Sequence, residues 1–119
     1  RGGNSVKVKW FGASSNLHRV WDEDLIEFQQ LSYTEYAKAI NFSTKEQRET
    51  LKAKSLADWV FSSYQVAGEI YADISEPDQK LYYAYNYKYL NVLNRQLLEG
   101  GIHLANVLNE IFGSDQAFN

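Results

Sequence analysis

The 119-residue sequence predicts an all-α domain of four or five helices, preceded by one short β-strand or hairpin. Three observations predict this architecture. Apolar residues recur at intervals of three and four over most of the chain, as on the buried face of a helix. Side chains that cap helix N-termini precede several of these stretches. A strand-type alternation of apolar and polar residues is found near the start of the chain.

The first fifteen residues predict a turn followed by a strand. Residues 1–4 read Arg-Gly-Gly-Asn, and paired glycines allow positive φ angles and a close approach of the backbone. After this turn, Val6, Val8 and Trp10 alternate with polar neighbours, so they face one side of a strand. We expect this strand to be half of a small hairpin that ends in residues 12–15.

The next segment predicts a helix that begins at Asn16, a residue whose side chain caps helix N-termini well. Its apolar residues form one stripe at helical spacing: Leu17, Val20, Trp21, Leu25 and Phe28. His18 and Asp22 lie on a neighbouring face of the same helix.

Two capping boxes predict the central helices. Ser32 followed by Glu35 opens one helix, and Ser43 followed by Glu46 opens a longer segment that breaks near Ser55. Residues 75–78 contain the only proline of the chain and predict a linker. A helix over 79–99 follows, with a break or a close packing contact at residues 100–101. The last helical stripe ends at residue 113, a glycine.

The amino-acid composition excludes several kinds of functional site but does not identify the function. The chain has no cysteine, which excludes a disulfide framework and a thiolate metal site within it. Its net charge of −3 does not fit a basic nucleic-acid-binding domain. The bases are unevenly spread, however, because residues 1–20 carry four Lys and Arg and no acid. We expect no membrane partner, since no stretch is long enough to span a bilayer.

His18 and Asp22 are the candidate metal ligands. They stand four residues apart on one helix, so their side chains lie about one turn apart on one face. An imidazole nitrogen and a carboxylate oxygen at this spacing suit one zinc ion, but a zinc site needs three or four protein ligands. A solvated surface pair is the alternative interpretation. His103 lies within an apolar stripe and is expected to be structural.

Several short motifs near the start of the chain resemble one family of nucleases. They resemble the zinc-dependent single-strand-specific nucleases, which comprise the fungal nucleases S-one and P-one and their plant and bacterial relatives, within the zinc-dependent phospholipase C superfamily. The resemblance covers the whole chain and is strongest over residues 1–26. The motifs are Arg1-Gly2-Gly3-Asn4, Phe11-Gly12, Asn16-Leu17-His18 and Val20-Trp21-Asp22.

The resemblance implies a phospholipase C/nuclease-type helical fold with three zinc ions in a cleft, one of them ligated by His18 and Asp22. It implies that Asn4 hydrogen-bonds the nucleobase 5′ of the scissile phosphate and that Arg1 flanks this base, within the loop that includes Gly2 and Gly3. No catalytic residue is implied beyond the metal ligands. The family cleaves single-stranded DNA and RNA to 5′-phosphorylated products and removes 3′-phosphates from nucleotides.

The resemblance also implies that most ligands of this site lie upstream of Arg1. We therefore expect residues 1–119 to be the C-terminal portion of a single helical nuclease domain, inactive alone and binding zinc partly or not at all. Such a portion should expose an apolar face, to be covered by the missing N-terminal portion or by another copy of the chain.

Two other functions stay open at this stage, a portion of a zinc-dependent phospholipase C and a non-catalytic helical interaction domain. The Gly-Gly-Asn element favours a nucleobase over a lipid headgroup. The family resemblance implies a periplasmic or secreted protein. The absence of cysteine favours a bacterial member, since the fungal and plant relatives carry disulfides.

Overall fold

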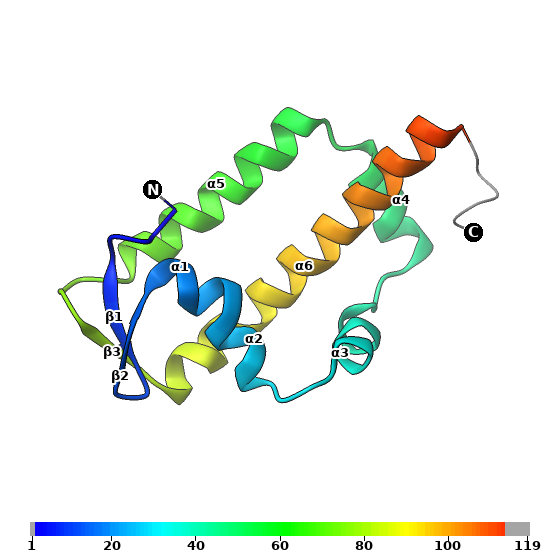
Figure 1. The fold of residues 1–119 in the computed structure, drawn as a ribbon. Helices are drawn as coiled ribbons and strands as arrows, with labels where there is room; N and C mark the ends of the chain where they lie inside the picture. Colours follow the sequence, from blue (N-terminus) through cyan, green and yellow to red (C-terminus); the bar gives the residue numbers. More distant parts are fainter. Residues whose placement is uncertain (1, 114–119) are drawn as a thin grey trace.

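The computed structural model describes residues 2–113 and shows a mostly helical protein with a small three-stranded sheet at one end (Figure 1). The predicted all-α class with a short hairpin is confirmed, and the sheet gains one strand that the sequence did not indicate. In chain order the elements are β1 (Lys7–Trp10), β2 (Ala13–Asn16), α1 (Leu17–Arg19), the π-helical turn η1 (Val20–Asp24), α2 (Leu25–Phe28), α3 (Tyr33–Ile40), α4 (Lys45–Ala53), α5 (Leu56–Ala72), β3 (Gln79–Leu81) and α6 (Tyr83–Phe112).

The predicted hairpin consists of β1 and β2, which pair antiparallel from Lys7 opposite Asn16 to Trp10 opposite Ala13. Its two-residue turn has positive φ at both positions, 49° at Phe11 and 83° at Gly12. Positive φ at both central residues matches the twist of antiparallel strands, which favours such a turn over one with negative angles. Residues 13–15, expected to end the strand, are thus part of its partner.

The third strand, β3, pairs parallel with β1 and was not predicted, since we expected a helix from residue 79. Hydrogen bonds from residues distant in sequence hold it in place: the Phe11 amide donates to the Leu81 carbonyl, and the Asp78 amide to the Lys7 carbonyl. Because the pairing partner lies about seventy residues upstream, local sequence patterns carry no signal for it.

The helix starts follow the capping residues closely. Asn16 accepts a hydrogen bond from the Arg19 amide, Ser32 forms the predicted capping box, and Ser55 begins α5 after the predicted break. The second capping box is formed by Thr44 and Gln47, one residue beyond the predicted pair. Both pairs, Ser43 with Glu46 and Thr44 with Gln47, place a hydroxyl three residues before a Glu or Gln that can bond the backbone amide of the capping residue. The sequence alone therefore does not distinguish the two capping boxes.

The last helix, α6, continues through residues 100–101, where a break was one of two expectations. The other expectation, a close packing contact, is not met either, because within the described part of the chain a Cβ on Gly100 or Gly101 would meet no atom within 4 Å. Each glycine inside a helix lowers its stability by about 1 kcal/mol relative to alanine, and α6 forms despite this cost. Both α3 and α4 pack against this helix. The helix ends as predicted at Gly113, which adopts the left-handed conformation with φ of 60°.

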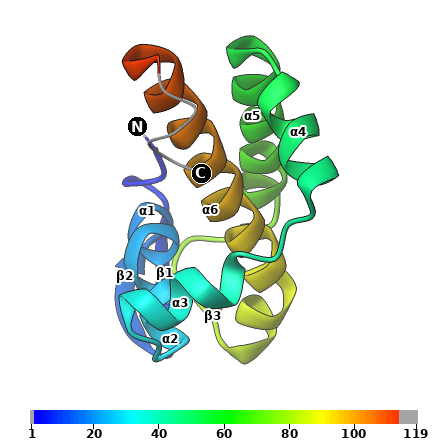
Figure 2. The same ribbon diagram turned by 90° about the vertical axis from the view of Figure 1, so that its right-hand side faces the viewer.

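The two long helices α5 and α6 lie side by side and run in opposite directions (Figures 1 and 2). Trp59 stacks on His103 near one end of the pair, and Asp73 contacts Tyr89 near the other. The sheet and the α1–η1–α2 segment cover the first turns of α6. The molecule is elongated, with a radius of gyration of 16.3 Å and extents of 48 × 31 × 22 Å. A compact domain of this length has a radius of about 13–14 Å.

Tyr36, Ile102 and His103 are buried elsewhere on α3 and α6, but the main cluster of buried apolar side chains lies at the end of the molecule that carries the sheet. It joins β1, β3, the η1–α2 segment and the first half of α6, through Val8, Val20, Leu25, Leu81, Tyr85, Tyr89 and Leu93. In contrast, α4 and α5 contain no buried residue. Large apolar side chains are exposed along α5 and the second half of α6, so the predicted exposure of an apolar face is observed: Leu56, Val60, Phe61, Tyr64, Leu104, Val107, Ile111 and Phe112.

No helix within residues 2–113 combines the length and the apolar character that a bilayer crossing requires.

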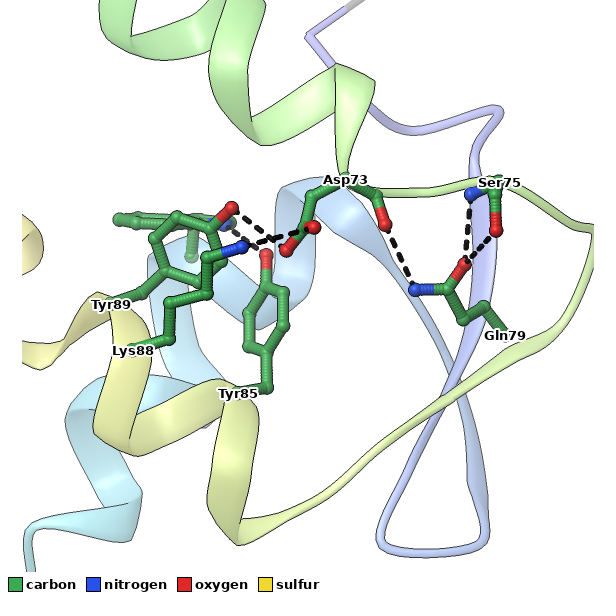
Figure 3. A network of polar contacts seen from close by, with 7 residues as sticks. Asp73, Ser75, Gln79, Tyr85, Lys88 and Tyr89 are labelled. Carbon is green, nitrogen blue, oxygen red and sulfur yellow. Dashed lines mark hydrogen bonds and ion pairs between the residues drawn. The ribbon is translucent and has the colours of Figure 1, made fainter.

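A polar network around Asp73 joins the C-terminal end of α5 to β3 and α6 (Figure 3). The carboxylate of Asp73 accepts hydrogen bonds from the Tyr89 hydroxyl at 2.9 Å and from Lys88 Nζ at 3.1 Å. Its backbone carbonyl accepts a third from Gln79 Nε2 at 3.0 Å. The Tyr89 and Lys88 contacts lower the pKa of Asp73, because both stabilise its charged form.

Acidification should weaken this network. Because the pKa of Asp73 is lower in the folded state than its ordinary value of 3.8, its contribution to stability is complete above that value. The contribution is lost as the pH falls through the lower, folded value. Urea unfolding of the chain between pH 6 and pH 2 should show this decline in the unfolding free energy. Asp73→Asn should flatten it, whereas Asp78→Asn, at an exposed carboxylate of the same linker, should keep it.

Truncation of the buried core should show where the stability resides. Leu25→Ala removes a fully buried side chain and should lower the unfolding free energy by about 2–5 kcal/mol. The same substitution at Leu56, whose exposure is 70%, should change it by less than about 0.5 kcal/mol. Equal losses at the two positions, measured by chemical denaturation, would show that stability is not concentrated at the sheet end.

Candidate metal centre

The two candidate metal ligands come from one short stretch of helix. His18 lies in α1 and Asp22 in the π-helical turn η1, where the cap that Asn16 provides fixes the start of the helix. His18 Nε2 and Asp22 Oδ2 are 2.8 Å apart, and the two side chains are 45% and 63% exposed. The predicted pairing on one face is therefore observed, on a helix that changes from α to π geometry between the two residues. Single π turns are frequent at functional sites.

The second ring nitrogen of His18 is held by the glycine loop. His18 Nδ1 lies 2.9 Å from the carbonyl oxygen of Gly2. A carbonyl oxygen only accepts hydrogen bonds, so Nδ1 carries the proton and donates it, and in the neutral ring Nε2 presents its lone pair. Metal-ligating histidines are commonly oriented in this way by a carbonyl or carboxylate behind the ring.

The close approach of the loop requires glycine at both positions. Gly2 and Gly3 have φ angles of 59° and 85°, which side-chain-bearing residues rarely adopt. A Cβ atom on Gly3 would lie 3.0 Å from the His18 amide nitrogen, and one on Gly2 would lie 3.3 Å from His18 Nδ1. The loop continues into Asn4, whose carbonyl accepts a hydrogen bond from Lys7 Nζ at 3.2 Å. Asn4 is exposed and lies two residues beyond the carbonyl that holds His18.

The neighbouring charged groups of this helix are paired differently. Arg19 Nε lies 3.4 Å from Glu23 and 3.7 Å from Asp24, and Asp24 also accepts a hydrogen bond from Ser15 at 2.8 Å. Asp22 is thus the acid of η1 that faces His18, although three acids follow one another closely in the sequence.

A hollow of about 230 Å³ opens beside the pair, between the glycine loop, η1 and α5. Its walls are mostly apolar, and those from α5 were not predicted. Trp21 stands directly before Asp22 in the sequence and was assigned only to a core stripe. Tyr71 lies almost fifty residues downstream, so no local pattern connects it to the site. The lining residues are Gly2, Gly3, Leu17, His18, Trp21, Asp22, Ala67, Ile70 and Tyr71.

The donor set fits two ligands of a zinc ion. A neutral imidazole nitrogen and a carboxylate oxygen are both zinc ligands, and two such ligands of one tetrahedral ion lie about 3.3 Å apart. The observed 2.8 Å is the separation of a hydrogen bond, in which a proton lies between the two atoms. A zinc ion in place of that proton would hold them about 0.5 Å further apart. Over residues 2–113, however, no group of three or more His, Asp or Glu side chains is placed to hold a metal. These residues therefore offer two candidate ligands and not a complete centre.

Two further residues singled out in the sequence are Arg1 and His103. Arg1 lies outside the described residues. His103 is 5% exposed on α6 and stacks on Trp59, with ring centroids 3.8 Å apart, which agrees with the structural role expected of it. Burial lowers the pKa of His103; among nearby charges, Glu99 raises it and Lys54 lowers it.

The protein is thus a helical protein in which a histidine and a carboxylate, His18 and Asp22, lie side by side next to the loop that contains Gly2 and Gly3. Comparison with known proteins makes this description specific, since the S1/P1 nuclease family model matches residues 1–113. The chain belongs to the S1/P1 nuclease family. Among curated proteins of Arabidopsis thaliana, it is 29% identical to Endonuclease 2 over 128 residues and 32% identical to Endonuclease 3 over 135 residues, covering 95% of the chain in both cases.

The chain spans less than half the length of these relatives, 44% of each. Endonuclease 1 of the same plant is matched over 43% of its length at 25% identity. The relatives also correct one prediction. They are plant proteins, so the assignment to a bacterial protein, and with it to the periplasm, is wrong. It relied on the absence of cysteine, which reports only that no disulfide forms within these 119 residues.

The hydrogen bond to Gly2 predicts the tautomer of His18. When neutral, the ring should carry its proton on Nδ1, and ¹⁵N NMR of histidine-labelled chain should show Nε2 at the shift of an unprotonated nitrogen. His103→Gln assigns the resonances of the second histidine. A neutral His18 with its proton on Nε2 would show that the Gly2 carbonyl does not orient the ring.

Proposed function

We propose that this chain is a portion of a zinc-dependent nuclease that hydrolyses single-stranded DNA and RNA to 5′-phosphorylated products and acts on 3′-nucleotides. Two findings support the proposal: family membership over residues 1–113, and the separation of 2.8 Å between His18 Nε2 and Asp22 Oδ2. The endonuclease names of the matched plant proteins agree with cleavage of a nucleic acid.

In this proposal, His18 and Asp22 hold one zinc ion. The Gly2 carbonyl keeps the His18 proton on Nδ1, so Nε2 is available to the metal without a change of tautomer. Asp22 supplies negative charge that favours a divalent cation. Held by His18 and Asp22, a zinc ion would supply Lewis-acid chemistry, polarising a phosphoryl group and lowering the pKa of water.

The loop before β1 is proposed to bind the substrate. The amide of Asn4 offers both a donor and an acceptor, which suits the edge of a nucleobase. The guanidinium of Arg1 is proposed to stack on the same base. Because the Gly2 carbonyl contacts His18, this loop connects base recognition directly to the metal ligand. A base has to leave a duplex to reach such a loop, and this favours single-stranded substrates.

We further propose that the remaining metal ligands lie outside residues 1–119, in a single helical domain of which this chain is one portion. Two ligands do not satisfy a catalytic zinc ion, which takes three protein ligands and a water or substrate. The 119-residue chain alone should then bind zinc weakly and not hydrolyse nucleic acid. Tight, stoichiometric zinc in the isolated chain, measured by elemental analysis after dialysis, would contradict this proposal.

The direct test uses the natural polypeptide that carries this sequence. His18→Ala and Asp22→Asn should each lower zinc affinity and hydrolysis of single-stranded DNA by at least about 100-fold, because even the loss of an outer partner of a ligand costs 10- to 100-fold. Glu23→Gln is the matched control, since this neighbouring acid pairs with Arg19 instead. Glu23→Gln should keep both the zinc affinity and the hydrolysis of single-stranded DNA.

Two outcomes would overturn the proposal. The first is full zinc-dependent hydrolysis by His18→Ala, which would show that the pair is not part of the centre. The second is hydrolysis of phosphatidylcholine with no action on single-stranded DNA, which would indicate the phospholipase branch of the superfamily.

A further inference from the structure

Trp21 is fixed to α6 by a part-buried hydrogen bond. Its indole Nε1 donates to the hydroxyl oxygen of Tyr85 at 3.0 Å. Trp21 directly precedes Asp22 in η1, and both residues line the hollow beside His18. The indole is therefore held at one end by Tyr85, while its backbone continues into a candidate metal ligand.

Tyr85 is itself held firmly in place. It is 7% exposed and packs against Tyr89, with ring centroids 4.6 Å apart. Tyr89 also contacts the Trp21 ring edge-on at 5.4 Å and donates its hydroxyl to Asp73 at the end of α5. Figure 3 shows Tyr85, Lys88 and Tyr89 rising from α6 beneath the end of α5, with Tyr89 and Lys88 both reaching Asp73. The support for Trp21 thus extends from α6 to α5.

The backbone that carries Asp22 needs such support. The residues Val20–Asp24 form a π-helical turn, in which the Leu25 amide bonds the Val20 carbonyl five residues back. A π turn is rare and is usually a local insertion in an α-helix. An inserted turn displaces its side chains from the α-helical positions, so side-chain anchors decide where they lie. Trp21 is the residue of this turn that bonds α6.

We propose that Tyr85 is a positioning residue for the candidate metal ligands: its hydrogen bond to Trp21 fixes η1 so that Asp22 Oδ2 faces His18 Nε2. The effect of Tyr85 on the positions of Asp22 and His18 does not depend on a bound metal. Its effect on zinc binding rests on the proposed function. The proposal extends the candidate site from local residues of the first two dozen positions to a tyrosine more than sixty residues away.

Tyr85→Phe tests the proposal, because it removes only the hydroxyl that accepts the Trp21 hydrogen bond. Tyr36→Phe is the matched control. The Tyr36 hydroxyl is a similar interhelical partner, donating to Asn94 Oδ1 at 2.6 Å on the same helix α6, and it is not part of the hollow beside His18. Both variants lose one part-buried hydrogen bond to α6, so their urea midpoints should fall by similar amounts.

Two readouts separate positioning from general stability. The first needs no metal: the ¹⁵N shift of His18 Nε2 and the ¹³C shift of the Asp22 carboxyl should change in Tyr85→Phe and not in Tyr36→Phe. The second is zinc affinity by chelator competition. Tyr85→Phe should weaken it about 3- to 10-fold, less than the 10- to 100-fold typical when a direct partner of a ligand is lost. Tyr36→Phe should leave it unchanged.

Unchanged His18 and Asp22 shifts in Tyr85→Phe would overturn the inference, as would equal changes in Tyr36→Phe. If the proposed function is wrong, the measurements will give a different result. If His18→Ala leaves zinc affinity unaltered, then the pair does not bind zinc, while the metal-free shifts still decide whether Tyr85 positions it.

Discussion

The hydrogen bond from His18 Nδ1 to the Gly2 carbonyl is the contact on which the organisation of the site depends. It selects the tautomer that leaves Nε2 unprotonated, and it brings the loop that includes Asn4 next to the ligand pair. The same contact explains two glycines in succession, since a Cβ at Gly3 would meet the His18 backbone at 3.0 Å. Loop conformation, ring orientation and availability of Nε2 are therefore set together by one short segment packed on the start of one helix.

The rest of the fold places this segment on the best-packed part of the molecule. The core beneath it joins the sheet, η1, α2 and the first half of α6, whereas α4 and α5 bury no residue completely. Asp73, Tyr89 and Tyr85 connect that core to the end of α5 and hold Trp21 beside Asp22. Rigidity is thus concentrated where a metal ligand needs a fixed orientation, and exposed apolar surface lies along the distal halves of the two long helices.

Local features of the sequence predicted much of this organisation. Asn16, Ser32 and Ser55 begin helices because a hydroxyl or amide side chain bonds amides within its own first turn, and the spacing of His18 and Asp22 places them on one face. What the sequence could not predict depends on distant partners. Strand β3 exists through pairing with β1, the wall formed by Tyr71 comes from another helix, and the Trp21–Tyr85 bond spans 64 positions. The hollow beside the pair was missed for the same reason.

The proposed site depends on His18 and Asp22 binding the same zinc ion. His18 binds it through Nε2, the ring nitrogen that does not contact the Gly2 carbonyl. Anomalous diffraction at the zinc edge, from crystals of the natural polypeptide that contains this sequence, tests this arrangement most directly. We expect an anomalous peak within about 2.0–2.2 Å of both His18 Nε2 and an Asp22 carboxylate oxygen, with His18 Nδ1 still bonded to the Gly2 carbonyl. A zinc peak bound elsewhere, or one bound through Nδ1 with the Gly2 contact broken, would contradict it.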